Sequence, residues 1–566
     1  MHRHITFLFF IIGFCSTELH AQNLNLNLKI IGETNDETEI IEGFIYNNTH
    51  IDYNSIINEA DSLQQKIIKS GYIESERNLL EKINDSSFQI QFQLHTKYDS
   101  IQIHYNTYDI NKKIIDNISQ KSFDGFFNTP FSTIEQVLQN INTKIAQNGF
   151  PFTKTKLSGI KIKKNKTLVA QLIIIKNQNK RSLDNIVIKG YEKFPKTYLR
   201  KFLKITPEQT FNIETIKRKL NAIKNIRFAK QTKAPEVLFT KDSTTLYIYL
   251  EKSKSNTFDG FLGFSTNEET NKIDFNGYIN LELNNNLNYG ESFNLIYKSD
   301  ESEQKNFEIN LNMPYLFSSP IGTEISLKII KRDSSFTSIN QKANVFYQLN
   351  QKNRIFLGLE STESNNLLDD NSNLEIADYK SNLYNVKYIF ENRQGNNSLF
   401  QIKSNVQIKF GLGKRKTSNA SENQKKIEID GFHSFQLNKK NSIYTRLNAA
   451  LIDSDNYYEN ELFRFGGINS IRGFKENSIL ANNYILLNTE YRYLLSTGIY
   501  AHTIIDFTQF ENEISNTKEN LYGFGFGFGI TTKAGLLRFN FANGKTATQN
   551  FKFSNSKIHL SLISLF

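Results

Sequence analysis

The strongest constraint on the fold is an alternation of apolar and polar residues with period two, which continues through residues 256–566. Successive side chains of a β-strand point to opposite faces, so such runs predict strands with one apolar and one polar face. The clearest run is LFQIKSNVQIKF (399–410), whose apolar face holds Phe400, Ile402, Val406, Ile408 and Phe410. The second half of the chain is therefore predicted to be antiparallel β-structure.

Sixteen segments carry this alternation, which suits a membrane barrel better than a soluble sandwich. The predicted strands lie near 257–266, 272–284, 289–298, 305–313, 321–331, 340–349, 353–362, 379–390, 399–410, 427–437, 441–452, 483–495, 499–507, 521–531, 535–542 and 557–566. Connections after even-numbered strands are mostly tight, whereas long ones after odd-numbered strands are expected at 363–378, 411–426, 453–482, 508–520 and 543–556. Outer-membrane barrels have short turns at one end and long loops at the other. Because backbone groups in lipid must all be paired, we expect a closed sixteen-stranded transmembrane β-barrel.

The first residues predict export from the cytoplasm. Arg3 precedes an apolar run over 5–15, which matches the core of a secretory signal and is too short to cross a bilayer. Small residues before Gln22 predict cleavage after Ala21, so that residues 1–21 are a signal peptide. The single cysteine, Cys15, lies in this leader, so the mature chain is predicted to have no disulfide and no thiol chemistry.

Between the leader and the barrel, helical and strand patterns repeat. Three amphipathic stretches at 55–72, 132–150 and 212–228 each end in an aromatic residue, and these aromatic residues are 78 positions apart. A repeated period predicts a repeated module. One larger α+β domain with chance spacing is the alternative. The predicted boundaries are 23–97, 98–179 and 181–252 for three α+β modules and 256–566 for the barrel.

The net charge of +11 does not indicate nucleic-acid binding. Lys and Arg are scattered among nearly as many acidic residues, whereas a nucleic-acid binder concentrates its positive charge in a stripe. The basic runs KIKKNK (161–166) and IKRKL (216–220) are interpreted as solvated faces.

The longest predicted loop contains FRFGGINSIRGF (463–474), which provides the most specific signal. Gly466 and Gly467 permit a tight turn with positive φ, and Arg472 is followed by Gly473 and Phe474. This segment resembles the Arg-Gly-aromatic motif of the BamA/TamA-type outer-membrane assembly barrels, the bacterial surface antigen family.

The resemblance implies that the loop folds back into the barrel and that its arginine meets acidic residues on the inner wall. Strand alternation in 486–495 and 500–507 points Glu490 and Asp506 inward, where they can hold Arg472. The family also has a glycine-rich strand followed by a segment like AGLLRFNFA (534–542). Its terminal strand resembles KIHLSLISLF, in which the signal residues are Leu560, Leu562 and Phe566. By the same resemblance, the three modules are POTRA-like.

The segment LYGFGFGFGI (521–530) puts aromatic side chains on one face and glycines on the other. The aromatic face is predicted to contact lipid. The glycines expected to face the lumen are Gly523, Gly525, Gly527 and Gly529. Because glycine in a strand often marks close approach of another backbone, we expect the loop to lie against them.

These features predict a non-enzymatic factor in the outer membrane of a Gram-negative bacterium, with its modules in the periplasm. It would insert or translocate unfolded outer-membrane or secreted client proteins, using module edges and a seam between the first and last strands. Periplasmic or inner-membrane partner proteins could bind the modules. No cofactor or metal is expected, and the client stays unidentified.

Two alternatives from other classes are weaker. A passive porin or transporter would have no use for three modules or an inward-facing arginine loop. An outer-membrane lipase or protease would need a nucleophile beside a base. The six histidines outside the leader lie in no recognisable nucleophile motif; they are His50, His95, His104, His433, His502 and His559.

Overall fold

The computed structural model describes residues 25–119, 122–163, 166–176, 179–266, 273–299, 304–368, 375–394, 399–546 and 556–565. The predicted signal peptide lies outside these residues. The chain forms two compact units: the first runs to Arg181 and includes Thr210–Asn212, and the second holds Ser182–Gln209 and the chain from Ile213 onward. None of the described helices is long and apolar enough to cross a membrane.

The first unit begins with a five-stranded sheet in the order β2-β1-β5-β3, with β4 also pairing to β5. Its elements are β1 (Leu26–Gly32), α1 (Asn35–Glu42), β2 (Thr49–His50), α2 (Tyr53–Lys69), β3 (Glu76–Arg77), β4 (Glu81–Asn84) and β5 (Ser87–Gln93). Asp52 caps α2 by accepting a hydrogen bond from the Ser55 amide at 2.7 Å. Ile56, Leu63 and Ile67 of α2 are buried at helical spacing, which packs the helix on the sheet.

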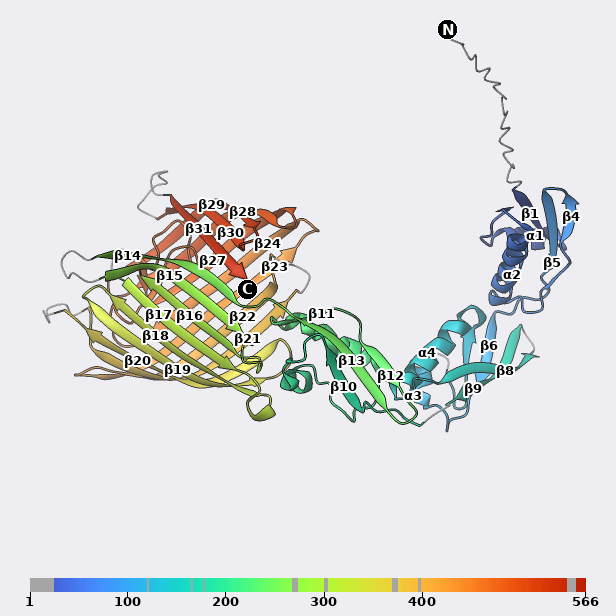
Figure 1. Ribbon diagram of the computed structural model, residues 1–566, viewed down its shortest axis with the longest axis horizontal. Helices are drawn as coiled ribbons and strands as arrows, with labels where there is room; N and C mark the ends of the chain where they lie inside the picture. Colours follow the sequence, from blue (N-terminus) through green and yellow to red (C-terminus); the bar gives the residue numbers. More distant parts are fainter. Residues whose placement is uncertain are drawn as a thin grey trace, which may run out of the picture. The chain divides into compact units, whose positions relative to one another are not determined.

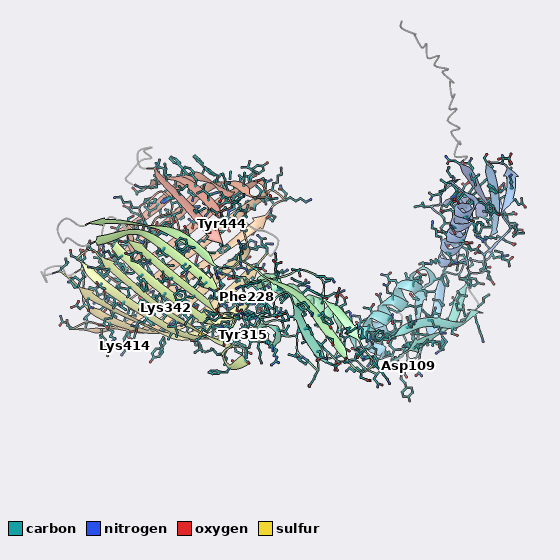
Figure 2. All side chains as sticks on the ribbon, viewed as in Figure 1. Asp109, Phe228, Tyr315, Lys342, Lys414 and Tyr444 are labelled. Carbon is teal, nitrogen blue, oxygen red and sulfur yellow. The ribbon has the colours of Figure 1, made fainter. Side chains whose placement is uncertain are left out.

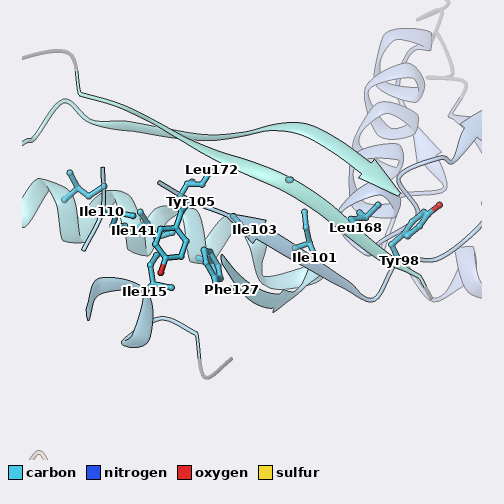
Figure 3. Packing of buried hydrophobic residues seen from close by; sticks show 13 residues of the cluster. Tyr98, Ile101, Ile103, Tyr105, Ile110, Ile115, Phe127, Ile141, Leu168 and Leu172 are labelled. Atoms are coloured by element: carbon cyan, nitrogen blue, oxygen red, sulfur yellow. The ribbon is translucent and has the colours of Figure 1, made fainter. Parts of the chain in front are cut away.

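A second sheet of the same unit has the order β7-β6-β9-β8. Its elements are β6 (Ser100–His104), α3 (Lys112–Asp116), β7 (Phe126–Pro130), η1 (Phe131–Thr133), α4 (Ile134–Gln147), β8 (Lys154–Lys163) and β9 (Thr167–Ile175). Figure 3 shows its core, in which Ile101, Ile103 and Leu168 from the strands pack with Ile141 of α4. Full burial of one such side chain stabilises the fold by about 1.5–3 kcal/mol.

The third sheet belongs to the second unit and has the order β10-β13-β11, with β12 also pairing to β13. Its elements are β10 (Asn185–Lys189), η2 (Tyr198–Phe202), α5 (Ile213–Leu220), η3 (Asn221–Asn225), β11 (Ala229–Gln231), β12 (Glu236–Phe239) and β13 (Thr244–Lys252). β10 and β13 are parallel, so the chain between them crosses over through the helical elements. We call residues 181–252 the third module.

The rest of the second unit is a closed barrel of sixteen antiparallel strands, which confirms the predicted fold class (Figure 1). The strands are β14 (Thr257–Thr266), β15 (Ile273–Asn284), β16 (Ser292–Ser299), β17 (Gln304–Met313), β18 (Ile321–Arg332), β19 (Phe336–Gln348), β20 (Asn353–Asn366), β21 (Tyr379–Arg393), β22 (Ile402–Lys416), β23 (Ser421–Gln436), β24 (Asn441–Asp453), β27 (Asn483–Ser496), β28 (Ile499–Asn512), β29 (Thr517–Thr531), β30 (Leu536–Lys545) and β31 (Lys557–Leu565). A short helical turn, η4 (Leu316–Ser318), precedes β18.

Alternation along the strands separates an apolar outside from a polar lumen. On β21, Tyr384 is 74% exposed and Val386 48%, whereas the intervening Asn385 is buried. An apolar exterior and a polar interior are typical of a membrane β-barrel.

The prediction of long loops over 411–426 and 508–520 is wrong. β22 and β23 are joined by the four residues 417–420, and β28 and β29 by 513–516. Outside the apolar band both faces of a strand contact water and can carry polar side chains. Backbone pairing therefore continues where the alternation has ended, and a prediction from alternation makes the strands too short. We call the end that carries loop 454–482 the long-loop end and the opposite end the short-turn end.

The prediction that Phe400 shares the apolar face of 399–410 is also wrong. Phe400 precedes β22 and packs against Tyr500, with the Arg492 guanidinium 4.5 Å from its ring centre. The register shifts where Arg393 pairs with Ile402, and this irregularity breaks the alternation.

Candidate functional site

The loop between β24 and β27, residues 454–482, lies inside the barrel and contacts inward-facing side chains on several strands. Its two short strands, β25 (Phe463–Phe465) and β26 (Ile479–Ala481), form a hairpin. Phe465 and Ala481 are buried with Tyr484 and Leu486 of the barrel wall. This apolar cluster holds the base of the loop in place.

The two adjacent glycines, Gly466 and Gly467, make the turn that directs the loop into the lumen. Gly466 has φ of 114° and Gly467 has φ of 97°, which other residues rarely adopt. Ser470 stabilises the turn, because its Oγ accepts from the Gly466 amide at 3.1 Å. A side chain at either glycine would also overlap Lys475 or Glu476, so space and conformation both require glycine here.

The structure brings Arg472, Glu490 and Asp506 together in the lumen. The Arg472 side chain donates from Nε to Asp506 Oδ2 at 2.9 Å and from Nη2 to Asp506 Oδ1 at 2.6 Å, and its Nη1 contacts Glu490. The Arg472 amide also donates to Asp506 Oδ2 at 2.9 Å. All three residues are buried, with Asp506 only 1% exposed. Bidentate, charge-assisted hydrogen bonds of this type are strong and directional.

Gly473 and Phe474 carry the loop to β30, the strand next to β31. Gly473 has φ of 93°, and a Cβ there would overlap the backbone at Asn543 and Gly544. The Phe474 ring in turn occupies the space beside Gly544. The predicted Arg-Gly-aromatic segment therefore lies against the inner face of the barrel close to its last strand.

The four glycines of β29 are explained only partly by the loop. A Cβ at Gly523 would overlap the carbonyl of Arg472, so the loop does approach this glycine. The space beside Gly527 is instead filled by His502 and Asn540, and that beside Gly529 by Tyr500. Gly525 faces the backbone of β30. The expectation that the loop covers all four is wrong, because bulky side chains of the neighbouring strands cover Gly527 and Gly529.

Several side chains that hold the loop could not be identified from the sequence. Arg415 of β22 is 1% exposed; it donates from Nη1 to the Asn456 carbonyl at 3.0 Å and also contacts Glu461. Arg446 of β24 donates to the Asn469 carbonyl at 2.7 Å. Alternation does point these arginines inward, but nothing in the sequence indicates which loop atom each one meets.

Further contacts reach the opposite wall of the barrel. Lys298 of β16 lies 3.1 Å from Glu476, and Arg332 of β18 pairs with Glu459. The loop therefore crosses the lumen and is fastened on both sides.

Described residues line two cavities in the lumen. A cavity of about 590 Å³ lies toward the short-turn end, and its lining includes Tyr198, Phe228 and Arg354. A second of about 310 Å³ lies nearer the long-loop end, and its lining includes Phe336, Tyr379 and Arg464. Lys342, labelled in Figure 2, lines both. Among the described residues, no group of His, Cys, Asp or Glu side chains is arranged to hold a metal ion.

The barrel closes between β14 and β31 with very little pairing. Their described residues pair at Thr257 with Leu565 and at Phe258 with Ser564, whereas β14 pairs with β15 from Thr257 through Thr266. Of the predicted terminal signal residues, Leu560 and Leu562 face outward on β31 and are exposed, and Phe566 lies outside the described residues.

The third module packs onto the short-turn end of the barrel through Tyr198, which contacts Phe228 and Tyr315, both labelled in Figure 2. The Tyr198 ring lies edge-on to Phe228 of the module and to Tyr315 of the turn before β18. Its hydroxyl donates to the Gly290 carbonyl at 3.2 Å. Burial raises the pKa of Tyr198 well above its ordinary value, so the hydroxyl stays neutral.

Comparisons with known proteins give a consistent family and fold. The Omp85 superfamily domain matches residues 276–558, and the surface antigen variable number repeat, POTRA, matches residues 182–251. No curated protein matches the chain.

The solved structures similar to the chain include the following three. CdiB from Escherichia coli has a TM-score of 0.53 at 12% identity, covering 89% of this chain and 96% of its own. CdiB from Acinetobacter baumannii has a TM-score of 0.50 at 15% identity, covering 83% and 90%. BamA from Haemophilus ducreyi lacking POTRA domains 1–3 has a TM-score of 0.49 at 14% identity, covering 82% and 99%.

Proposed function

Because the chain belongs to the Omp85 superfamily, we propose that it inserts client proteins into the outer membrane of a Gram-negative bacterium or moves them across it. The observation that carries the proposal is the seam, where β14 and β31 pair at two described positions. A strand entering lipid must find partners for its backbone groups, since each unsatisfied group costs several kcal/mol there. A seam with few hydrogen bonds can open to supply them at low cost.

The modules would receive the client before it reaches the seam. Among the described strands, β10 pairs with β13 alone, so its other edge can accept an extended client strand by β-augmentation. In this proposal the modules lie in the periplasm, and loop 454–482 braces the wall beside the seam through Gly473 and Phe474.

The test uses cysteines at Phe258 and Ser564, which are paired across the seam. The only native cysteine is Cys15 in the predicted leader, so no other thiol interferes. We expect Phe258→Cys/Ser564→Cys to crosslink, to retain a folded barrel, and to lose client insertion until it is reduced. Insertion that continues after complete crosslinking would refute a lateral route.

A matched control places the same bridge inside the wall. Ile408 and Ile429 are paired between β22 and β23, far in sequence from the seam. Ile408→Cys/Ile429→Cys should crosslink without changing insertion, because that part of the wall need not open.

A passive pore and an enzyme are the competing functions. Loop 454–482 crosses the lumen and is fastened on both walls, which opposes free diffusion through the barrel. Ser404 and His433 form a 2.7 Å hydrogen bond between β22 and β23, a contact that a nucleophile and its base could make. No carboxylate among the described residues contacts His433 to orient it, so the pair supports no catalytic role.

A further inference from the structure

The expectation that the positive charge is scattered is wrong for one part of the chain, because nearly all of the net charge lies on the third module. Residues 181–252 contain sixteen Lys and Arg against seven Asp and Glu, a net charge of +9, whereas the whole chain carries +11. The barrel, residues 256–566, contains thirty-two of each sign and is neutral. A charge separation this large within one compact unit needs a physical cause beyond general solubility.

Basic side chains gather on the helical elements of the third module and form a basic patch. The patch consists of Lys201 near the end of η2, Lys204 just after it, Arg218 and Lys219 on α5, and Lys224 on η3. The Lys219 ammonium donates to Gln209 Oε1 at 3.0 Å and to the Lys204 carbonyl. Burial and the nearby charges of Lys204 and Arg218 lower the pKa of Lys219, so these groups repel one another.

This basic patch has few acidic neighbours. Lys217 pairs with Glu214 at 3.1 Å. For the patch residues themselves, no ion pair with a carboxylate is found in the described part of the chain. Lys201, Lys204, Arg218 and Lys224 are exposed. A cationic surface without acidic partners is suited to bind an anion from outside the chain.

The patch lies beside the rim of the barrel. The Phe202 carbonyl accepts a hydrogen bond at 3.3 Å from Gln351, which lies in the turn between β19 and β20. η3 lies against β21. At this same end of β19, Tyr347 and Leu349 are exposed on the outer surface, where lipid would contact the barrel. Lys201, Lys204 and Lys224 therefore stand close to the level of the lipid headgroups.

We propose that this basic patch binds the anionic phosphate headgroups of the lipid leaflet at the short-turn end of the barrel. Lys and Arg form charge-assisted hydrogen bonds with phosphate. Near an anionic membrane surface, each basic residue strengthens attachment about five-fold. Lipid binding would fix the third module against the membrane. The inference rests on the membrane-embedded barrel of the proposed function but does not depend on client handling.

The test compares full-length protein in nanodiscs of zwitterionic lipid with protein in nanodiscs containing phosphatidylglycerol. A fluorophore on Asn221→Cys, at the start of η3, reports proximity to headgroup-labelled quenching lipid. We expect stronger quenching with phosphatidylglycerol and weakening as salt rises, because salt screens exposed charges. A nanodisc has no periplasm, so the result does not depend on which side the modules occupy.

The decisive variant is Lys201→Gln/Lys204→Gln/Lys224→Gln. Its matched control, Lys189→Gln/Lys233→Gln/Lys241→Gln, removes the same charge from β10 and from the segments flanking β12. We expect the patch variant to lose on the order of a hundred-fold in apparent affinity for phosphatidylglycerol, since three contributions of about five-fold multiply. The control should keep the lipid dependence.

Three results would overturn the inference. The first is equal quenching in both lipids. The second is an equal loss of affinity for phosphatidylglycerol in the two triple variants. The third is loss of the lipid dependence in millimolar inorganic phosphate, which would assign the patch to soluble anions. Client insertion is measured on the same nanodiscs. If client insertion is intact but quenching shows no lipid dependence, this inference alone is rejected. The proposed function is tested separately, by whether insertion is lost after seam crosslinking.

Discussion

At the residue scale, Arg472 is the side chain on which the position of the loop tip most depends. Removing one member of a buried charged pair costs about 3–5 kcal/mol, and lumen water reduces that cost. We expect Arg472→Ala to increase protease cleavage of loop 454–482 at least ten-fold, which corresponds to about 1.4 kcal/mol. Heat-modifiable migration should persist, because the strand ladder holds the barrel together.

Two comparisons sharpen this prediction. Arg472→Lys keeps the charge but loses the two-nitrogen fork that holds Asp506, so it should give an intermediate cleavage rate. Lys425→Ala breaks an ion pair with Asp453 whose side chains are both more than half exposed, so it should have little effect. Equal cleavage in Arg472→Ala and wild type would mean that the other contacts of the loop hold it without Arg472.

Gly523 gives a second prediction at this scale. A Cβ at Gly523 would overlap the Arg472 carbonyl, so Gly523→Ala should push the loop away from β29 and reduce client insertion. Gly411→Ala is the control, because the nearest atom to its Cβ would be Leu383 at 3.6 Å, an ordinary contact. The measurement is a spin-label distance between the loop tip and β28. An unchanged distance in Gly523→Ala would contradict the steric argument.

The meeting of Arg472 with Glu490 and Asp506 could be predicted because strand alternation fixes which side chains point inward. The contacts of Arg415 and Arg446 could not, because they depend on how a long loop folds over sites distant in sequence. The interpretation of the β29 glycines is half correct. Alternation predicts their face but cannot show that His502 and Tyr500 fill the space beside two of them.

At the element scale, loop 454–482 is a strut with a second anchor at the long-loop end. Glu461 is buried against Arg415, and burial raises the pKa of Glu461 above its ordinary value although Arg415 opposes the shift. Arg415→Ala removes that opposition. A carboxyl group whose pKa is higher in the attached loop favours attachment at low pH, and this contribution is lost as the pH rises through the raised pKa.

We therefore expect the Arg415→Ala loop to resist protease in acidic buffer and to be cleaved at neutral pH. The wild-type loop should resist at both. Arg415→Ala/Glu461→Gln has no carboxyl group to titrate and should behave alike in both buffers. If the single variant is also independent of pH, Glu461 is not the group that releases the loop.

Strand number could be predicted from the sequence, but strand ends could not. Each predicted strand has a counterpart in the barrel, because lipid and lumen impose period two on every crossing. Past the apolar band the sequence no longer has to alternate, so the strand end leaves no signal. β23 begins at Ser421 rather than near 427. In the second sheet's helix, Ser132 and Glu135 have the spacing of a capping box, but the structure does not form one. A short helical turn places Thr133 at the start of α4, with no side-chain cap.

At the scale of the whole second unit, the third module closes the short-turn end of the barrel. The cavity of about 590 Å³ is lined by module residues, including Tyr198 and Phe228, as well as by barrel residues. Asn285 of the turn after β15 donates to the Tyr191 hydroxyl at 2.6 Å, and Arg227 pairs with Glu282. Access to the lumen from this end therefore depends on how firmly the module is docked.

Substitutions of Tyr198 test whether access to the lumen depends on docking of the module. Its ring contacts Tyr315 and fills the space beside Gly290, and truncation of a buried aromatic side chain costs about 3–5 kcal/mol. Tyr198→Ala should undock the module, raise hydrogen exchange in the turns at 285–291 and 314–320, and increase ion conductance through the barrel in planar bilayers. Tyr198→Phe removes only the hydrogen bond to the Gly290 carbonyl, worth about 0.5–1.5 kcal/mol, and should stay close to wild type. Gly290→Val, made from the barrel side, should reproduce the alanine phenotype by excluding the ring. If all three variants conduct like wild type, loop 454–482 rather than the module seals the lumen, and conductance should then rise in Arg472→Ala instead.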